Sequence, residues 1–213
     1  MGRFGWKAGQ PSLRQQNAEA FANDMGLSSH LVPTDSCSSA QPDCLAMPNG
    51  GEVEVSDSIL DNVTFYTRNL AVPARRDVDD AQVLAGKSLF FQANCQGCHV
   101  PVFTTGADAA EPELANQTIR PYTDMLLHDM GPGLADERPE FLADGNEWRT
   151  PPPRGLGLTK VVNPQAGFLH DGRAETIEHA ILWHDGEARA AADGYRQLPK
   201  NERDALIRFL NSL

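Results

Sequence analysis

Five consecutive residues, Cys95-Gln96-Gly97-Cys98-His99, combine two thiols and an imidazole at a spacing that suits covalent haem attachment. In the C-x-x-C-H signature the two thiols bond the vinyl groups of a c-type haem, and the adjacent histidine gives the iron an axial nitrogen. Two intervening residues let both sulfurs reach one edge of the porphyrin. Cys95, Cys98 and His99 are therefore candidate cofactor-binding residues, and they predict haem c.

The competing uses of these cysteines each lack a required part. A structural zinc site would need a second cysteine or Cys/His pair at short spacing, but Cys37 and Cys44 are seven residues apart. A thioredoxin-type dithiol would need a βαβ setting, which the sequence does not predict. Cys37 and Cys44 lie in a Ser/Pro-rich stretch and predict a disulfide in an oxidising compartment, the alternative being two unrelated thiols.

Composition narrows the class of protein and of partner. The chain has 213 residues, 40% of them hydrophobic, and a net charge of -11. This acidity argues against nucleic acid as a partner and favours a positively charged protein or a neutral small molecule. No apolar run is long enough to predict a transmembrane segment. Covalent haem attachment predicts a periplasmic or otherwise exported protein, and since residues 1–6 lack the apolar region of a signal sequence, we expect a longer precursor.

The first 75 residues are predicted to form an N-terminal arm. A helix is expected over 11–25, with Pro11 in its first turn and Gly26 as its stop. Residues 27–55 have no periodicity and predict an irregular segment held by the disulfide. A second helix, capped by Ser56 or Asp57, is expected to end before Pro73. The boundary with the next domain is placed within 71–76.

Residues 76–213 are predicted to form a c-type cytochrome domain, so that the fold class is mainly α with long irregular loops. A helix after Asp79 and Asp80 should deliver the haem motif, with an apolar face of Val83, Leu84, Phe90 and Phe91. Gly86 inside this helix predicts a close crossing with a C-terminal helix that starts at Pro199. That helix carries an apolar stripe: Leu206, Ile207, Leu210 and Leu213. Between 100 and 159 we expect loops, a β-like segment at 118–120 and a short helix over 122–128.

The second axial position of the iron separates an electron carrier from an enzyme, because a protein ligand closes it and an open position admits substrate. Side chains that could fill it are Met125, Met130, His128, His170, His179 and His184. In a helix capped by Thr176, His184 ends an apolar stripe that begins at Ile177, whereas His179 should face solvent. His184 could instead hydrogen-bond a carbonyl near the helix end.

Three further residues have possible roles around the haem. Met130 lies in a loop that could offer its thioether to iron, although a lone Met more often fills a gap in a core. Arg173 could pair with a haem propionate or simply be a surface charge, and His170 could orient a neighbouring group.

Several segments together resemble one bacterial family. They are 86–90 leading into the haem motif, Pro121-Tyr122-Thr123-Asp124, 127–131, Trp148-Arg149-Thr150-Pro151-Pro152, 168–173 and the start at 2–8. The chain resembles di-haem thiol oxidoreductases, which are similar to di-haem cytochrome c peroxidases and to the di-haem enzyme of methylamine dehydrogenase maturation. The resemblance implies that His184 occupies the position of the distal ligand of the C-terminal haem, which places Met130 second.

The resemblance also implies what this chain does not carry. Only one C-x-x-C-H is present, so the substrate-accessible N-terminal haem domain of the peroxidases has no counterpart here, and the chain resembles the electron-transfer half. After 148–152 the chain has Pro153-Arg154 where a larger apolar pair is expected. The peroxidases hold calcium through backbone carbonyls near the region of 165–167. Such ligands leave no side-chain signature, so calcium is the weaker cofactor expectation.

Three functions are compatible with these residues. The first is a mono-haem electron-transfer module, whose partner is a redox protein or the absent N-terminal haem domain. The second is a peroxidase or thiol oxidoreductase acting at this haem, which needs an open iron position and a proton donor, for which His128 is the candidate. The third is a structural module stapled by its haem. We favour them in that order.

Overall fold

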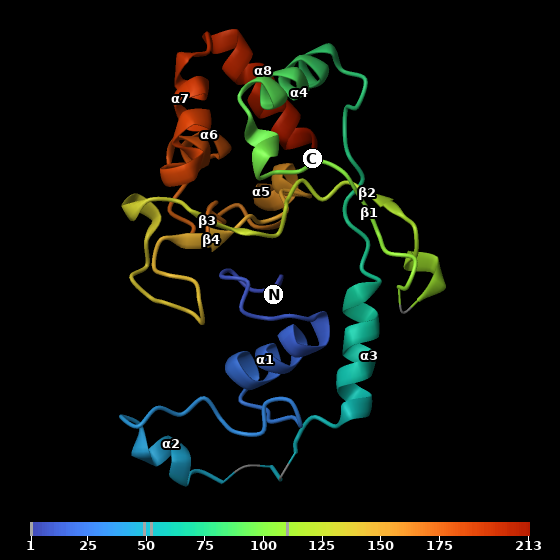
Figure 1. Ribbon diagram of the computed structural model, residues 1–213, viewed down its shortest axis with the longest axis vertical. Coiled ribbons are helices and arrows are strands. Elements are labelled where there is room, and N and C mark those ends of the chain that lie inside the picture. The colour runs from blue at the N-terminus through green and yellow to red at the C-terminus, as the bar shows by residue number, and fades with distance from the viewer. Residues whose placement is uncertain (1, 49, 52, 110) are drawn as a thin grey trace. The chain divides into compact units, whose positions relative to one another are not determined.

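The computed structural model describes residues 2–48, 50–51, 53–109 and 111–213. The chain divides into two compact units, Met1–Ala71 and Val72–Leu213, which are considered separately (Figure 1). The described residues form eight α-helices and only short strands, so the chain is mainly α, as predicted. The assignment of the second unit to the c-type cytochrome fold stays a prediction.

Two longer helices and one short helix make up the first unit: α1 (Leu13–Met25), α2 (Pro42–Ala46) and α3 (Asp57–Arg68). The prediction that Pro11 lies in the first turn of α1 is wrong, because the helix begins two residues later, at Leu13. The Ser12 side chain caps it by accepting a hydrogen bond from the Gln15 amide. Gly26 ends α1 with a φ of 68°, a left-handed conformation that glycine adopts readily. Ser56 caps α3, as predicted.

The first unit has a small core and several polar contacts between α1 and α3. Ala18, Val55 and Leu60 are buried together. The buried Asn17 amide donates to the hydroxyls of Thr64, at 3.3 Å, and Thr67, at 3.0 Å. The predicted disulfide between Cys37 and Cys44 is present, with their Cα atoms 5.8 Å apart.

In the second unit, α4 (Ala81–Gln92) crosses the C-terminal helix α8 (Lys200–Ser212) (Figure 1). The close approach predicted at Gly86 is confirmed, because a Cβ added there would lie 1.9 Å from the carbonyl oxygen of Ala205. Glycine at this position therefore lets the two backbones approach closely enough for their apolar faces to form a common core.

The core of the second unit joins α4, α8 and the segments between them. Its buried members are Val83, Leu89, Phe90, Tyr122, Ile177, Tyr195, Ala205, Leu206, Phe209, Leu210 and Leu213. The prediction that Leu84 and Phe91 belong to the buried face is wrong: both are exposed, and Leu89 lies inside instead. Phe209 is fully buried although the predicted stripe of α8 omitted it.

The remaining elements of the second unit are short. They are η1 (Cys95–Gly97), β1 (Phe103–Thr104), η2 (Pro112–Leu114), β2 (Thr118–Ile119), β3 (Leu127–Asp129), η3 (Pro132–Leu134), β4 (Glu147–Arg149), η4 (Leu156–Leu158), α5 (Thr159–Val162), α6 (Ile177–Leu182), η5 (Gly186–Ala188) and α7 (Arg189–Gln197). Strands β1 and β2 pair antiparallel, as do β3 and β4.

The helix predicted over 122–128 is absent, and strand β3 begins at Leu127. Tyr122 and Met125 have φ values of 55° and 58°, in the left-handed region, where a right-handed helix cannot continue. The β-like segment predicted at 118–120 is confirmed as β2. None of the described helices has the length and apolar content required to cross a membrane.

Candidate functional site

The C-x-x-C-H motif lies at the end of α4, which positions it against the core. The side chain of Asp80 caps the helix by accepting from the amides of Gln82 and Val83. After α4 ends, Asn94 adopts a φ of 58° and redirects the chain into η1. The amide of His99 then donates to the Cys95 carbonyl at 2.9 Å, which folds the motif into one compact turn.

His99 is held in one tautomer by its surroundings. Its Nδ1 lies 3.0 Å from the carbonyl oxygen of Tyr122, and because a carbonyl can only accept, Nδ1 carries the proton. Burial lowers the pKa of His99 to about 4, with a further lowering from His184. At neutral pH the ring is therefore uncharged, with a free lone pair on Nε2.

The Tyr122 carbonyl is fixed by an unusual stretch of backbone. Tyr122 is buried with positive φ, and the next residue, Thr123, is fully buried and donates through its hydroxyl to the Thr150 carbonyl at 2.5 Å. The Asp124 amide donates to the carbonyl of Cys98 at 2.9 Å. A left-handed tyrosine carries backbone strain, so its retention by these contacts is consistent with a role in orienting His99.

His184 follows α6, which begins at the Thr176 cap predicted from the sequence. Its Nδ1 donates to the Ala180 carbonyl at 2.7 Å, so Nε2 is unprotonated and its lone pair is available to a metal, as in His99. Burial lowers the pKa of His184 as well. His179 is exposed, as predicted from its place off the apolar stripe.

The rings of His99 and His184 lie side by side, with centroids 6.5 Å apart and planes inclined by 45°. A histidine nitrogen binds a metal at about 2.0–2.1 Å, so two imidazoles on opposite sides of one ion would have ring centres roughly 6 Å apart. Two neutral, oriented imidazoles at this separation, beside two cysteines, fit the axial ligand set of a c-type haem.

The two motif cysteines are not joined to each other and remain free thiols. Burial raises the pKa of Cys95 to about 11, and burial followed by the charges of Asp124 and Glu187 raises the pKa of Cys98. Reactive dithiols need a lowered thiol pKa, so this environment disfavours a redox role for the pair. It is compatible with thiols destined for a covalent bond to an apolar group.

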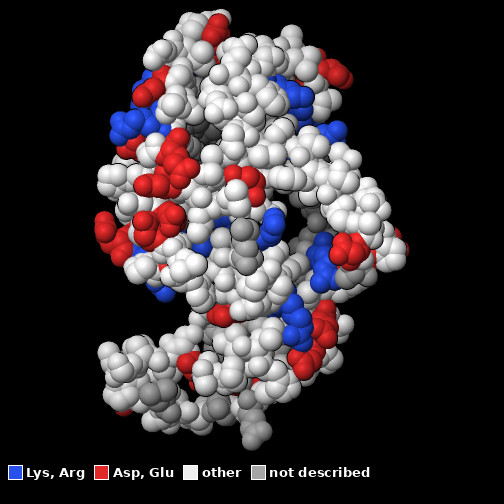
Figure 2. Space-filling model, viewed as in Figure 1, with Lys and Arg blue, Asp and Glu red and all other residues white. Residues whose placement is uncertain are grey.

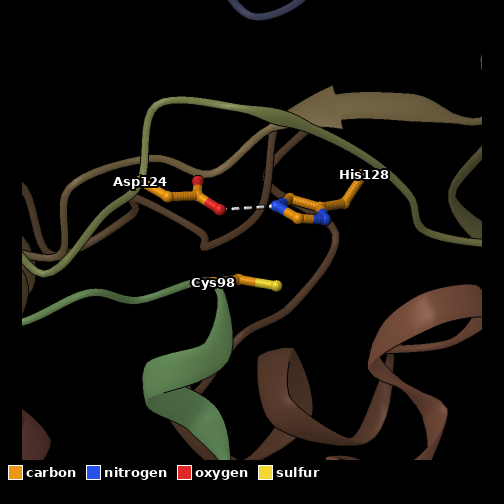
Figure 3. A group of neighbouring side chains, drawn as sticks. All are labelled: Cys98, Asp124 and His128. Carbon is orange, nitrogen blue, oxygen red and sulfur yellow. Dashed lines mark hydrogen bonds and ion pairs between the residues drawn. The ribbon is translucent and has the colours of Figure 1, made fainter.

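A second group of titratable side chains lies beside Cys98 (Figure 3). His128, on β3, makes a hydrogen bond through Nε2 to Asp124 at 2.8 Å and through Nδ1 to Glu187 at 2.9 Å. Burial lowers the pKa of His128, but the two carboxylates outweigh it and raise the pKa overall. The same contacts help to lower the pKa of Asp124 and of Glu187.

Sequence reasoning named His128 but missed both of its carboxylate partners. Glu187 lies on η5, 59 residues away, and no local pattern links the two positions. Asp124 is four residues from His128, and because a helix was predicted over 122–128, this spacing could have signalled the pair.

Cys98, Asp124 and His128 have donor atoms within 4.8 Å of one another, which raises the question of a separate metal centre. Both ring nitrogens of His128 are already engaged by carboxylates, and Cys98 belongs to the haem motif. The group is therefore better described as a hydrogen-bonded network at the edge of the haem site than as a metal site.

The other predicted site residues are placed as follows. His170 stacks on Trp148, with ring centroids 3.6 Å apart. Arg173 donates to the Asp171 carboxylate and to the Gly133 carbonyl, and its guanidinium lies over Trp183. Its contact with a propionate stays a prediction.

Met130 follows β3, and its amide donates to the Asn146 carbonyl at 3.0 Å. The choice of His184 over Met130 as the second ligand stays a prediction, supported by the 6.5 Å separation of the His184 and His99 ring centroids. Calcium binding near 165–167 stays a prediction.

Comparison with known proteins places the chain in a family. Among curated proteins no significant match was found. The model of the family described as "Di-haem oxidoreductase, putative peroxidase" matches residues 1–213, that is, the whole chain. Because that match spans the whole chain, the chain belongs to the di-haem oxidoreductase family.

Proposed function

We propose that the second unit is a c-type cytochrome domain that carries single electrons. Cys95 and Cys98 would hold the haem covalently, and His99 and His184 would bind its iron. The observation that carries this proposal is the 6.5 Å separation of the ring centroids of two neutral imidazoles that lie beside two free thiols. When bound, the haem would supply a one-electron iron couple.

The protein residues around this couple would set its properties. The Tyr122 and Ala180 carbonyls accept from the Nδ1 atoms of His99 and His184 and would make both imidazoles stronger donors. Two nitrogen ligands give a lower reduction potential than a His/Met pair, because a Met ligand raises the potential. A closed second position also favours electron transfer over reaction with peroxide at this iron.

The proposed electron-transfer function also implies a cellular compartment and a partner. We place the protein in the periplasm or another exported compartment, since covalent haem attachment belongs there and the Cys37–Cys44 disulfide suits an oxidising environment. Its partner would be a redox protein or a second haem domain of the di-haem type.

The test compares His184→Ala with the parent by near-infrared magnetic circular dichroism and low-temperature electron paramagnetic resonance. We expect a bis-histidine signature in the parent and its loss in the variant. His179→Ala, on the same helix but exposed, should keep the parent spectrum. A second substitution, His184→Met, should raise the reduction potential. A bis-histidine signature that survives His184→Ala would contradict the assignment.

A second candidate function is peroxidase activity at this haem. It is favoured by the family description and by His128, a proton donor held between Asp124 and Glu187 close to Cys98. Peroxide-dependent turnover of the holoprotein that is abolished by His128→Ala and retained by His179→Ala would support it. A holoprotein without peroxide-dependent turnover would contradict the peroxidase function and favour the electron carrier.

A further inference from the structure

One segment of the second unit, next to the haem site, combines exposed apolar side chains with many carboxylates. We define the acidic hairpin as residues 127–149, from the start of β3 to the end of β4. It contains six carboxylate side chains and only two arginines. The carboxylates are Asp129, Asp136, Glu137, Glu140, Asp144 and Glu147. Figure 2 shows acidic side chains gathered on the left flank of the molecule, where Figure 1 draws β3 and β4.

The tip of the acidic hairpin presents two apolar residues to water. Phe141 is 79% exposed and Leu142 is 99% exposed. Two backbone hydrogen bonds, both 3.0 Å, join Glu140 and Ala143 on either side and make the tip a defined turn. Phe141 adopts a φ of 53°, an unusual conformation for a bulky residue. A defined turn that holds two adjacent apolar side chains in water indicates a site of contact with another protein.

The stem of the hairpin brings like charges together. Asp129 and Glu147 are directly opposite one another in the β3–β4 register, an arrangement that destabilises a strand pair. Glu187 adds a third carboxylate, since its Oε1 accepts from the Asp129 amide at 3.0 Å. A cationic surface placed against this stem would relieve the repulsion.

The loop that follows β3 in the hairpin contacts the residue before the proposed iron ligand. Gly133 lies against the ring of Trp183, because an added Cβ would be 3.4 Å from ring atom Cζ3. Arg173 fixes this contact by donating to the Gly133 carbonyl while its guanidinium carbon lies 5.0 Å from the ring centroid of Trp183. Trp183 is 41% exposed and immediately precedes His184.

We propose that the acidic hairpin is the docking surface for a small, lysine-rich electron-carrier protein, with Phe141 and Leu142 as the apolar centre of the contact. This proposal rests on the proposed function and specifies its partner. In the complex one electron passes between the two prosthetic groups, so that the donor is oxidised, the acceptor is reduced, and no covalent bond changes.

Charge complementarity selects this occupant over a second copy of the chain. A symmetric pair of hairpins would place carboxylates against carboxylates, which costs binding energy and slows association. Lysines that surround an apolar patch would instead meet both features of the surface. Attraction between opposite charges would also accelerate the encounter at low salt.

The experiment measures electron transfer by stopped flow. The holoprotein is reduced with dithionite, freed of excess reductant and mixed with a ferric, lysine-rich mitochondrial cytochrome c. We expect the second-order rate constant to fall about tenfold or more as salt is raised, since steered association is strongly screened. The same probe with acetylated lysines should react slowly at all salt concentrations. The double variant Phe141→Ser/Leu142→Ser should lower the low-salt rate by about tenfold.

A matched control exists in the same unit. Val161 and Val162, on α5, are 75% and 84% exposed and follow Lys160 rather than carboxylates. Val161→Ser/Val162→Ser should keep the parent rate. Glu137→Gln/Glu140→Gln should lower the rate at low salt and flatten its salt dependence. All variants should keep the parent spectrum and potential.

Four results would overturn the docking proposal while leaving the haem assignment intact. They are an unchanged rate in Phe141→Ser/Leu142→Ser, an equal loss in the α5 control, an acetylated probe as fast as the native one, and a dimer of the free chain that the tip variant dissolves. Failure of the proposed function would differ, because the parent itself would lack a bis-histidine spectrum or a reversible one-electron couple with dithionite.

Discussion

The two cysteine pairs of this chain lie in different units and differ in chemical state. Cys37 and Cys44 form a disulfide within a long irregular segment of the first unit, whose core contains only Ala18, Val55 and Leu60. Cys95 and Cys98 remain free at the edge of the much larger core of the second unit. A covalent link supplements the few apolar contacts of the first unit, whereas the thiols of the second unit lie against a larger core and are the proposed attachment points of the haem.

The same contrast holds for the way in which polar groups are used. In the first unit Asn17 and the threonines of α3 hydrogen-bond to each other and join two helices. In the second unit His99 and His184 each give one nitrogen to a carbonyl and keep the other free. The hydrogen bonds of the first group all stay within the fold and join its helices, whereas the second nitrogen, Nε2, of each histidine ring is available to bind another group.

Removing the thiols of the second unit should have the largest effect. Cys95→Ala/Cys98→Ala should abolish covalent haem, because no other free cysteine exists in the chain. Denaturing electrophoresis with a haem stain and intact-mass analysis would measure this. Cys37→Ala/Cys44→Ala is the control and should keep covalent haem. Haem lost equally from both variants would mean that the two pairs do not have separate roles.

The helix crossing that supports the motif should be the next most sensitive point. Gly86→Ala would place a Cβ 1.9 Å from the Ala205 carbonyl oxygen, so α4 and α8 must separate. We expect a loss of about 3 kcal/mol in the free energy of unfolding, in the range of overpacked cores. Denaturant unfolding followed by haem absorbance would measure it.

Gly194→Ala is the matched control for the crossing. Gly194 lies in α7 with nothing within 4 Å of an added Cβ, so alanine there should stabilise the protein by about 0.5–1 kcal/mol. Equal effects at the two glycines would show that helix propensity, rather than the close approach of α4 and α8, decides the outcome at Gly86.

Loss of the disulfide should have a smaller effect that is confined to the first unit. Cys37→Ala/Cys44→Ala should lower the free energy of unfolding of that unit by about 2 kcal/mol, because the open chain gains entropy. Far-ultraviolet circular dichroism would report an earlier first transition. The haem absorbance transition should be unchanged, and a parallel shift in it would contradict the independence of the two units.

Local patterns were sufficient to predict several parts of this molecule. Gly86 in an apolar helix predicted the crossing with α8. The offsets from Ile177 predicted an apolar stripe ending at His184, and in the structure Ile177 is buried while His184 is partly buried. The Cys37–Cys44 bridge was predicted from spacing and composition. Each of these features depends on residues close together in sequence or on one repeating period.

The errors arose where distant contacts override local preference. Residues 122–128 were assigned to a helix, but Tyr122 is held in a left-handed conformation by contacts with neighbouring segments. Leu84 and Phe91 were predicted to lie in the core because α4 has apolar residues on more than one side. The position of the partner helix decides which of these sides is buried, and both residues are exposed. Glu187 was missed because its contact with His128 spans 59 residues.

The smallest predicted effect concerns the charge network at the edge of the haem site. The pKa of His128 is raised in the folded protein, so its contribution to stability is present below its unfolded pKa of about 6.5 and is lost as pH rises through the folded value. The pKa of Asp124 and of Glu187 is lowered, so their contributions are lost as pH falls through the folded values.

His128→Gln should therefore destabilise the second unit most at mildly acidic pH. We expect a difference of about 1 kcal/mol from the parent near pH 6, because one partner of the histidine, Glu187, is exposed to solvent and screened. The difference should shrink toward alkaline pH, where the parent's histidine also becomes neutral. Denaturant unfolding at several pH values would measure it, with His30→Gln as the control, since His30 pairs with Asp57 in the first unit. A difference that is constant with pH would show that the packing of the ring, rather than its charge between two carboxylates, is what stabilises this edge.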